Sequence, residues 1–148
     1  FIPEGKFNEI ELYFGNIEIR HHIVRLDIDV KELADRYIEQ AKELNAKIYE
    51  LLPIENESRK LPQSGYYKGK PFWGTWQERN DARNAFNDYI DSKYGIIRWT
   101  DKLLNAQGEL DFDCMEKPKS IHLSREHYPY WNGVEPDAMS QSLESFFG

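Results

Sequence analysis

The stretch that organises the predicted fold runs from residue 8 to residue 20 and reads NEIELYFGNIEIR. Apolar and polar residues alternate on both sides of a central Gly-Asn dipeptide, which is typical of a two-residue turn. Such a turn places Leu12 opposite Ile19, so the apolar side chains share one face. We therefore expect an antiparallel β-hairpin over residues 8–29, with a bulge near residues 22–24, where the apolar parity flips.

Two amphipathic helices are predicted after the hairpin. Asp29 is a suitable N-cap for a helix over residues 31–52, whose apolar residues recur with a period of 3.6. A second helix is expected over residues 77–94, because its inward positions are apolar and Gly95 supplies a stop.

The order of the predicted elements indicates the α+β class. Short strands are expected at residues 96–99 and 109–114, and a short C-terminal helix from about residue 137. The predicted fold is thus an N-terminal antiparallel β-hairpin packed on two long amphipathic helices, with further short strands and the terminal helix. The length of 148 residues predicts a single domain, 1–148, in which residues 138–148 dock on their own core or bind a partner.

Charge and composition limit the classes of partner. The chain has 19 Lys and Arg against 26 Asp and Glu, so its net charge is −7. Nucleic-acid affinity comes largely from cations on phosphates, so we expect a protein partner rather than dominant nucleic-acid binding, although a local basic patch is compatible with this total. No apolar run is long enough to span a membrane.

The ends and the single cysteine give two further expectations. Cys114 is the only cysteine, so no intramolecular disulfide forms, and a reducing, cytoplasmic location is expected. The chain begins at Phe1 rather than Met, as a processed chain or a fragment would.

Two pairs of aspartates have the spacing of one strand face, Asp27 with Asp29 and Asp111 with Asp113. If the two strands were neighbours, four carboxylates would converge and could hold Mg²⁺ or Ca²⁺. The alternative is that each pair lies on a solvated outer face. No cofactor is therefore expected, and a divalent metal at these pairs is the alternative.

Other reactive side chains are expected to be structural. His21 lies on the apolar face of the predicted hairpin, and Cys114 is flanked by apolar residues. The sequence contains no phosphate-binding loop, dinucleotide fingerprint or nucleophile elbow. The sequence therefore gives no support for enzymatic activity and does not exclude it.

Two aromatic clusters could border one groove. The first lies within residues 66–76 together with Lys68 and Lys70, and the second covers residues 128–131. Aromatic rings between lysines can stack on single-stranded bases or on sugars, whereas in the alternative interpretation the rings pack back onto the domain. The predicted groove residues are Tyr66, Tyr67, Trp73, Trp76, Tyr130 and Trp131.

The last nine residues, SQSLESFFG, place a leucine and two adjacent aromatics at fixed spacing. From Ser140 they fit S-x-x-L-x-x-F-F, with Leu143, Phe146 and Phe147 at the apolar positions. This pattern resembles the sliding-clamp-interacting peptide (PIP box) of replication and repair proteins, whose first position is Gln. Through Ser142-Leu143-Glu144 and Phe147-Gly148, the end is also similar to the C-terminal clamp-binding tail of T-even-type phage replicative polymerases.

The resemblance implies a peptide whose apolar side chains fill a pocket on a sliding clamp. The same residues, preceded by Met139, also have the i, i+4, i+7 spacing of a terminal helix docked on its own core. Both interpretations stay open at this point.

Three functional hypotheses follow from the sequence. The first is an accessory protein, or a fragment of one, in DNA replication, repair or recombination that binds a sliding clamp through its C-terminal peptide. The second is a small acidic protein-binding module of the inhibitor or immunity-protein type. The third is a metal-dependent hydrolase or nuclease that uses the paired aspartates.

Overall fold

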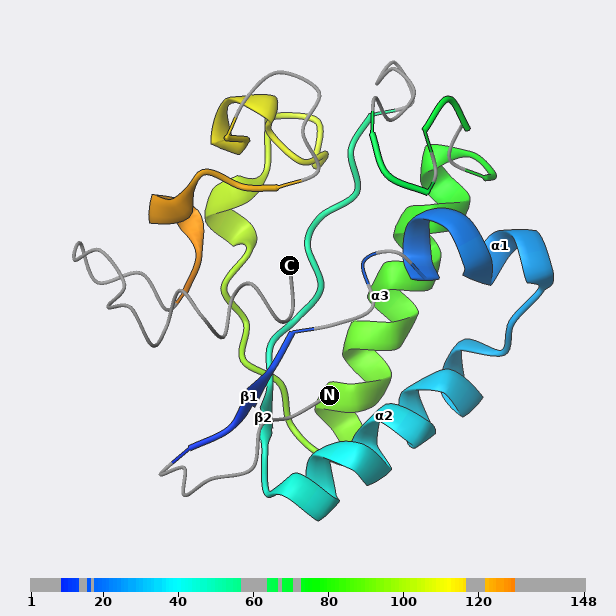
Figure 1. The fold of residues 1–148 in the computed structure, drawn as a ribbon, viewed down its shortest axis with the longest axis vertical. Coiled ribbons are helices and arrows are strands. Elements are labelled where there is room, and N and C mark those ends of the chain that lie inside the picture. Colours follow the sequence, from blue (N-terminus) through cyan, green and yellow to red (C-terminus); the bar gives the residue numbers. More distant parts are fainter. Residues whose placement is uncertain are drawn as a thin grey trace.

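Figure 1 shows a computed structural model of the chain, which describes residues 9–13, 16, 18–56, 64–66, 68–70, 73–116 and 122–129. The strands are β1 (Glu11–Leu12) and β2 (Lys47–Ile48). The α-helices are α1 (Ile23–Leu26), α2 (Val30–Leu44) and α3 (Trp76–Lys93). A π-helical turn, η1 (Glu18–His22), leads into α1, and the 3₁₀ turns η2 (Asp101–Leu103), η3 (Phe112–Cys114) and η4 (Arg125–His127) follow α3. Within these residues, none of the helices combines the length and the apolar character that a membrane crossing requires.

An extended segment that starts at β2 forms the centre of the fold. β2 pairs with β1 in parallel, with Leu12 opposite Ile48. On the other side of β2, the Ile97 N–H donates to the Ile48 carbonyl at 2.8 Å and the Glu50 N–H donates to the Ile97 carbonyl at 3.0 Å. Parallel neighbours need a crossover connection, and α1 and α2 lie in the connection between β1 and β2.

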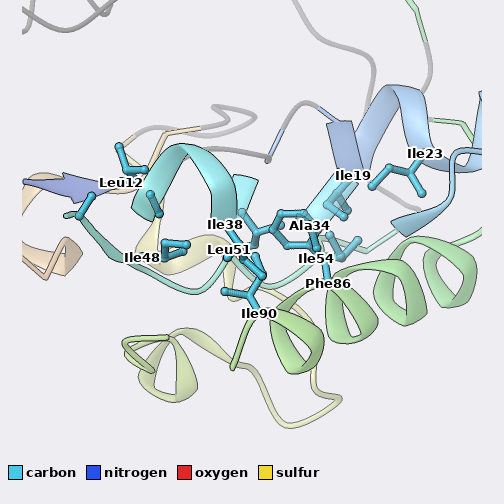
Figure 2. Close-up of a cluster of buried hydrophobic side chains, with 12 residues drawn as sticks. Leu12, Ile19, Ile23, Ala34, Ile38, Ile48, Leu51, Ile54, Phe86 and Ile90 are labelled. Atoms are coloured by element: carbon cyan, nitrogen blue, oxygen red, sulfur yellow. The ribbon is translucent and has the colours of Figure 1, made fainter. Parts of the chain in front are cut away.

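The main hydrophobic cluster lies where α2 and α3 meet this segment (Figure 2). The rings of Tyr37 and Phe86 join the two helices with their centroids 5.9 Å apart. The Tyr89 hydroxyl on α3 donates to the Asp35 carboxylate on α2 at 2.8 Å. The buried members of the cluster are Leu12, Ile19, Ile23, Ala34, Ile38, Ala41, Ala46, Ile48, Leu51, Ile54, Phe86 and Ile90.

A second hydrophobic cluster is formed by the 3₁₀ turns, which Figure 1 shows across the extended segment from α1 and α3. Leu52 links it to the extended segment, and Trp99 packs against it between aromatic neighbours. The Trp99 ring lies edge-on to Tyr13, with centroids 5.8 Å apart, and stacks on Tyr128 at 6.4 Å. Its buried members are Leu52, Leu103, Leu110, Cys114, Met115 and Leu123.

The predicted antiparallel hairpin is wrong. β1 ends at Leu12 and pairs in parallel with β2, and residues 18–26 are helical. Buried Ile19 and Ile23 are four residues apart, so they lie on one side of a helix as readily as alternating residues lie on one side of a strand. The parity flip near residues 22–24 marks the passage from η1 into α1 instead of a bulge.

The first predicted helix, over residues 31–52, is too long. Asp29 is confirmed as its N-cap, because its carboxylate accepts the Lys31 N–H at 2.9 Å. The helix ends at Leu44, since Asn45 adopts a left-handed φ of 49° and turns the chain into β2.

The remaining predicted elements also differ from the structure. The second helix, expected over residues 77–94, runs Trp76–Lys93, but no hairpin packs on it. The strands expected at residues 96–99 and 109–114 are reduced to single bridging pairs at Ile97 and Leu110 within the described part of the chain. The terminal helix expected from residue 137 lies outside the described residues, as does the whole of residues 138–148.

Candidate functional site

A buried ion pair lies at the end of the extended segment. Arg20 of η1 approaches both carboxylate oxygens of Glu55, with Nε 2.9 and 3.0 Å from them and Nη2 at 2.8 Å. Arg20 is 4% exposed and Glu55 is fully buried. Burial lowers the pKa of the Arg20 guanidinium, but the Glu55 carboxylate more than offsets this and leaves that pKa above its ordinary value. The Arg20 guanidinium therefore remains charged inside the fold.

A second buried carboxylate, Glu50, ties the extended segment to the chain after α3. It accepts the N–H groups of Trp99 and Thr100, each at 2.7 Å, and the Thr100 hydroxyl at 2.8 Å. Arg98 lies 3.3 Å away. Burial raises the pKa of the Glu50 carboxyl, but the hydrogen bonds from Trp99 and Thr100 outweigh burial and leave this pKa below its ordinary value. A carboxylate with a lowered pKa is a weak base, so the geometry gives Glu50 a structural role.

α3 turns a polar stripe of Arg79, Arg83 and Asn87 toward the interior at i, i+4 spacing. Arg83 donates twice to the Leu51 carbonyl, at 3.0 and 2.9 Å, and Asn87 accepts the Leu51 N–H at 3.0 Å. Leu51 is buried and lies beyond β2, where no strand pairs with it in the described residues. The side chains of Arg83 and Asn87 therefore supply the hydrogen bonds that its backbone N–H and carbonyl need. Arg79 donates to the Gly74 carbonyl at 2.6 Å and so holds the loop that precedes α3.

Two exposed rings each lie next to a cation, Tyr66 next to Lys70 in the loop before α3 and Trp73 next to Arg25 of α1. The group called here the cation–aromatic surface consists of Arg25, Tyr66, Lys70 and Trp73. Lys70 Nζ lies 4.6 Å from the centroid of the Tyr66 ring. Arg25 Cζ, on α1, lies 5.9 Å from the Trp73 ring. Tyr66 is 82% exposed and Trp73 is 52% exposed. Chemically, this surface offers flat apolar faces next to positive charge.

The other predicted groove aromatics divide into two groups. Trp76 is half-buried, and its indole N–H donates to the Ile54 carbonyl at 3.0 Å, so it belongs to the fold. Tyr67, Tyr130 and Trp131 lie outside the described residues. Sequence reasoning missed Arg25, because a residue 48 positions before Trp73 gives no local sign of contact with it.

The paired aspartates act locally. Asp27 ends α1 in a left-handed conformation with φ of 48°, and Asp29 caps α2. Asp111 accepts the Asp113 N–H at 3.0 Å and so caps η3. Among the residues that the structure describes, no three His, Cys, Asp or Glu side chains are placed to hold a metal ion, so the four carboxylates are not gathered into one site.

The buried histidine and the cysteine are confirmed as buried residues. Burial and the nearby Arg20 lower the pKa of His21 to about 4. Burial raises the pKa of the Cys114 thiol. A neutral thiol is a poor nucleophile, in keeping with a packing role.

An open cleft of about 550 Å³ lies at the start of β2 and the end of α3. Residues 45–48 and 94–97 line it together with Glu9. Lys47 Nζ, at its edge, is 2.6 Å from Glu9 Oε1, and the Tyr94 hydroxyl donates to the Ala46 carbonyl. These contacts hold the cleft walls together and present no group of converging catalytic side chains.

The four predicted partner-binding residues, Ser140, Leu143, Phe146 and Phe147, lie outside the described residues, so the structure brings none of them to a site. Comparison of the chain with protein-family models, with curated proteins and with solved structures finds no match.

Proposed function

We propose that this chain is an accessory protein of DNA replication, repair or recombination that binds a sliding clamp through residues 140–147. The observation that carries the proposal is the spacing of Leu143, Phe146 and Phe147. On one helical turn, side chains three and four residues apart share a face, so these three can enter one apolar pocket together. A cytoplasmic location and a protein partner accompany this proposal.

The length of chain before the apolar positions suits a tethered peptide. The twelve residues from Pro129 to Ser140 span at most about 40 Å when extended. That reach would let the peptide occupy a clamp pocket while the domain remains beside the clamp.

Calorimetric titration of the full chain with the clamps that bind the two similar peptide families tests the proposal. We expect Phe146→Ala/Phe147→Ala to abolish binding and to leave the melting temperature unchanged, because a few apolar anchors carry most of the affinity of such peptides. Ser145→Ala, at a variable position of both patterns, is the matched control and should bind as the wild type does. Unchanged clamp binding by the double variant, with a lower melting temperature, would show that the two rings pack in the core and would refute the proposal.

A second candidate, an acidic protein-binding module, is favoured by the outer face of α3. This helix buries Arg79 and Arg83 and exposes carboxylates. The exposed acidic residues are Glu78, Asp81, Asp88 and Asp91, of which Asp88 and Asp91 lie 2.9 and 3.2 Å from Arg98 Nη2. Such a face suits a basic partner.

Titration with an oligolysine peptide at low ionic strength tests this candidate. Asp81→Asn/Asp88→Asn should weaken oligolysine binding if the α3 face is the interface, and it should leave clamp binding intact. If oligolysine binds equally well to the double variant, the α3 face is excluded as the interface.

A further inference from the structure

The described part of the chain exposes three aromatic rings, those of Tyr66, Trp73 and Phe112. The surroundings of these rings differ. Tyr66 and Trp73 each have a cation over the ring, whereas Phe112 lies between Asp111 and Asp113 in the sequence. Exposed aromatics next to cations are the usual feature of surfaces that bind flat, negatively charged ligands.

The backbone of Trp73 is fixed although its ring is half exposed. Its N–H donates to the Arg20 carbonyl at 3.2 Å, and Arg79 donates to the next carbonyl, that of Gly74. Gly74 has a φ of 80°, and a Cβ there would lie 2.8 Å from Val24 Cγ1. The backbone at Gly74 therefore lies so close to Val24 of α1 that a larger side chain would not fit without a shift. A ring held in this way loses little freedom when a ligand stacks on it.

The charge of this region is opposite to that of the whole chain. In the described residues 64–66, 68–70 and 73–76, the charged side chains are Lys68 and Lys70, and both are positive. Lys68 and Lys70 are exposed, and α1 adds exposed Arg25. The flanking Glu78 keeps its negative charge, and its carboxylate accepts the Thr75 N–H at 2.8 Å in the cap of α3. The exposed cations Lys68, Lys70 and Arg25 outnumber Glu78 and the exposed Asp27 that ends α1, so a polyanion would meet local attraction here despite the net charge of −7.

We propose that the cation–aromatic surface binds single-stranded nucleic acid. Bases stack on the rings of Tyr66 and Trp73, while Lys70 and Arg25 lie next to the phosphates. A single strand is the ligand because the bases of a duplex are stacked on one another and offer no free faces to protein rings. An acidic peptide would use the cations alone and would leave the fixed, exposed Trp73 without a purpose. The inference is independent of the clamp-binding peptide.

Fluorescence anisotropy of a labelled oligothymidine of about twenty nucleotides, titrated with the full chain at low ionic strength, is the test. A matching oligouridine arm distinguishes DNA from RNA as the source of the strand. We expect Trp73→Ala to weaken binding roughly ten- to one-hundred-fold, because one stacked base is lost. Trp73→Phe should retain most of the affinity. Phe112→Ala is the matched control, an exposed ring in acidic surroundings, and should bind as the wild type does.

The salt dependence of the same titration tests the cations separately. Lys70→Ala and Arg25→Ala should each reduce the slope of log affinity against log salt by about 0.7, since each removes one contact with a single-strand phosphate. These slopes and the Trp73→Phe result decide the question even if Trp73→Ala unfolds the protein.

Four results would overturn the proposal. They are no oligonucleotide binding at low salt, wild-type affinity of Trp73→Ala, a duplex of the same length bound as tightly as the single strand, and displacement of the strand by equimolar oligoglutamate. The last result would assign the surface to an acidic peptide.

Discussion

The interior along the extended segment and the surface beside α1 use the same kinds of side chain in opposite ways. Inside, Arg20 is buried against Glu55 with its Nε 2.9 Å from the carboxylate. Outside, Arg25 lies 5.9 Å from the centroid of a half-exposed Trp73 ring. Burial makes an arginine part of the framework, because its charge must be matched within the chain. Exposure leaves the charge next to solvent, where a ligand can replace water.

The largest expected effect comes from removing the buried counter-charge. Glu55→Gln keeps the shape of the side chain but leaves the Arg20 guanidinium buried without a carboxylate. An uncompensated buried charge costs about 3–5 kcal/mol, and we expect the free energy of unfolding to fall by that amount. Urea denaturation followed by circular dichroism measures it.

The matched control for this variant is the exposed ion pair on α2, where Arg36 Nη2 lies 2.6 Å from Glu32 Oε1. Glu32→Gln should change the free energy of unfolding by no more than about 0.5 kcal/mol, because water screens an exposed pair. If the two variants lost equal stability, the contrast between interior and surface would not hold.

A smaller loss is expected where the interior meets the surface, at Gly74. Gly74→Ala forces a side chain into a left-handed conformation with its Cβ 2.8 Å from Val24 Cγ1, so we expect a loss of about 1–3 kcal/mol. Gly108 has a similar φ of 79° and open space around it. Gly108→Ala is therefore the control for backbone strain alone. Thermal melts of both variants give the contribution of the Val24 contact by difference, and equal losses would show that the contact contributes nothing.

Acid should weaken the interior further through His21. Burial and the nearby Arg20 lower its folded-state pKa to about 4 from an ordinary value of 6.5. Between these values the unfolded chain binds a proton that the folded chain does not, so stability is complete above pH 6.5 and is lost as the pH falls toward 4. The depressed pKa of Glu50 adds a loss only below its ordinary value of 4.5.

Urea denaturation between pH 4 and pH 7 measures this dependence. His21→Gln should flatten the curve between pH 6.5 and pH 4.5, whereas the same replacement at exposed His122 should retain the slope. A curve for His21→Gln as steep as that of the wild type would exclude His21 as the source.

Local signals in the sequence predicted local structure, and they failed where a partner segment decides the conformation. Asp29 as a helix cap followed from residue type and position, and it is confirmed. The alternation around residues 10–19 predicted a hairpin, but the partner of β1 is β2, 36 residues later. Apolar residues up to Leu51 also continued the helical period of α2, although Asn45 ends that helix. The apolar pattern alone cannot separate a hairpin from a parallel strand, or a longer helix from a helix followed by a strand. It shows which residues are apolar, but it does not show which segment packs on them.

The candidate surface was predictable only in part. Tyr66 and Trp73 stood out as aromatics close to Lys68 and Lys70 in the sequence, and the structure exposes both. The positions of Arg25 and of Arg79 required the fold, because they come from elements that reach the loop only through tertiary packing. A glutamate buried at position 55 also looks like any solvated charge in the sequence, since its partner Arg20 is 35 residues away.

Apart from the control variants, the smallest loss of stability is expected at Trp73, whose ring is half exposed. Trp73→Ala removes an exposed ring and its contact with Arg25, which amounts to about 0.5–1 kcal/mol of unfolding free energy. Trp99→Ala, which removes a ring packed between Tyr13 and Tyr128, should cost about 3–5 kcal/mol. Urea denaturation of both variants tests this. A loss at Trp73 as large as that at Trp99 would place its ring among the structural groups of the fold. A small loss, together with weakened binding of a single strand, would mean that this ring serves a ligand.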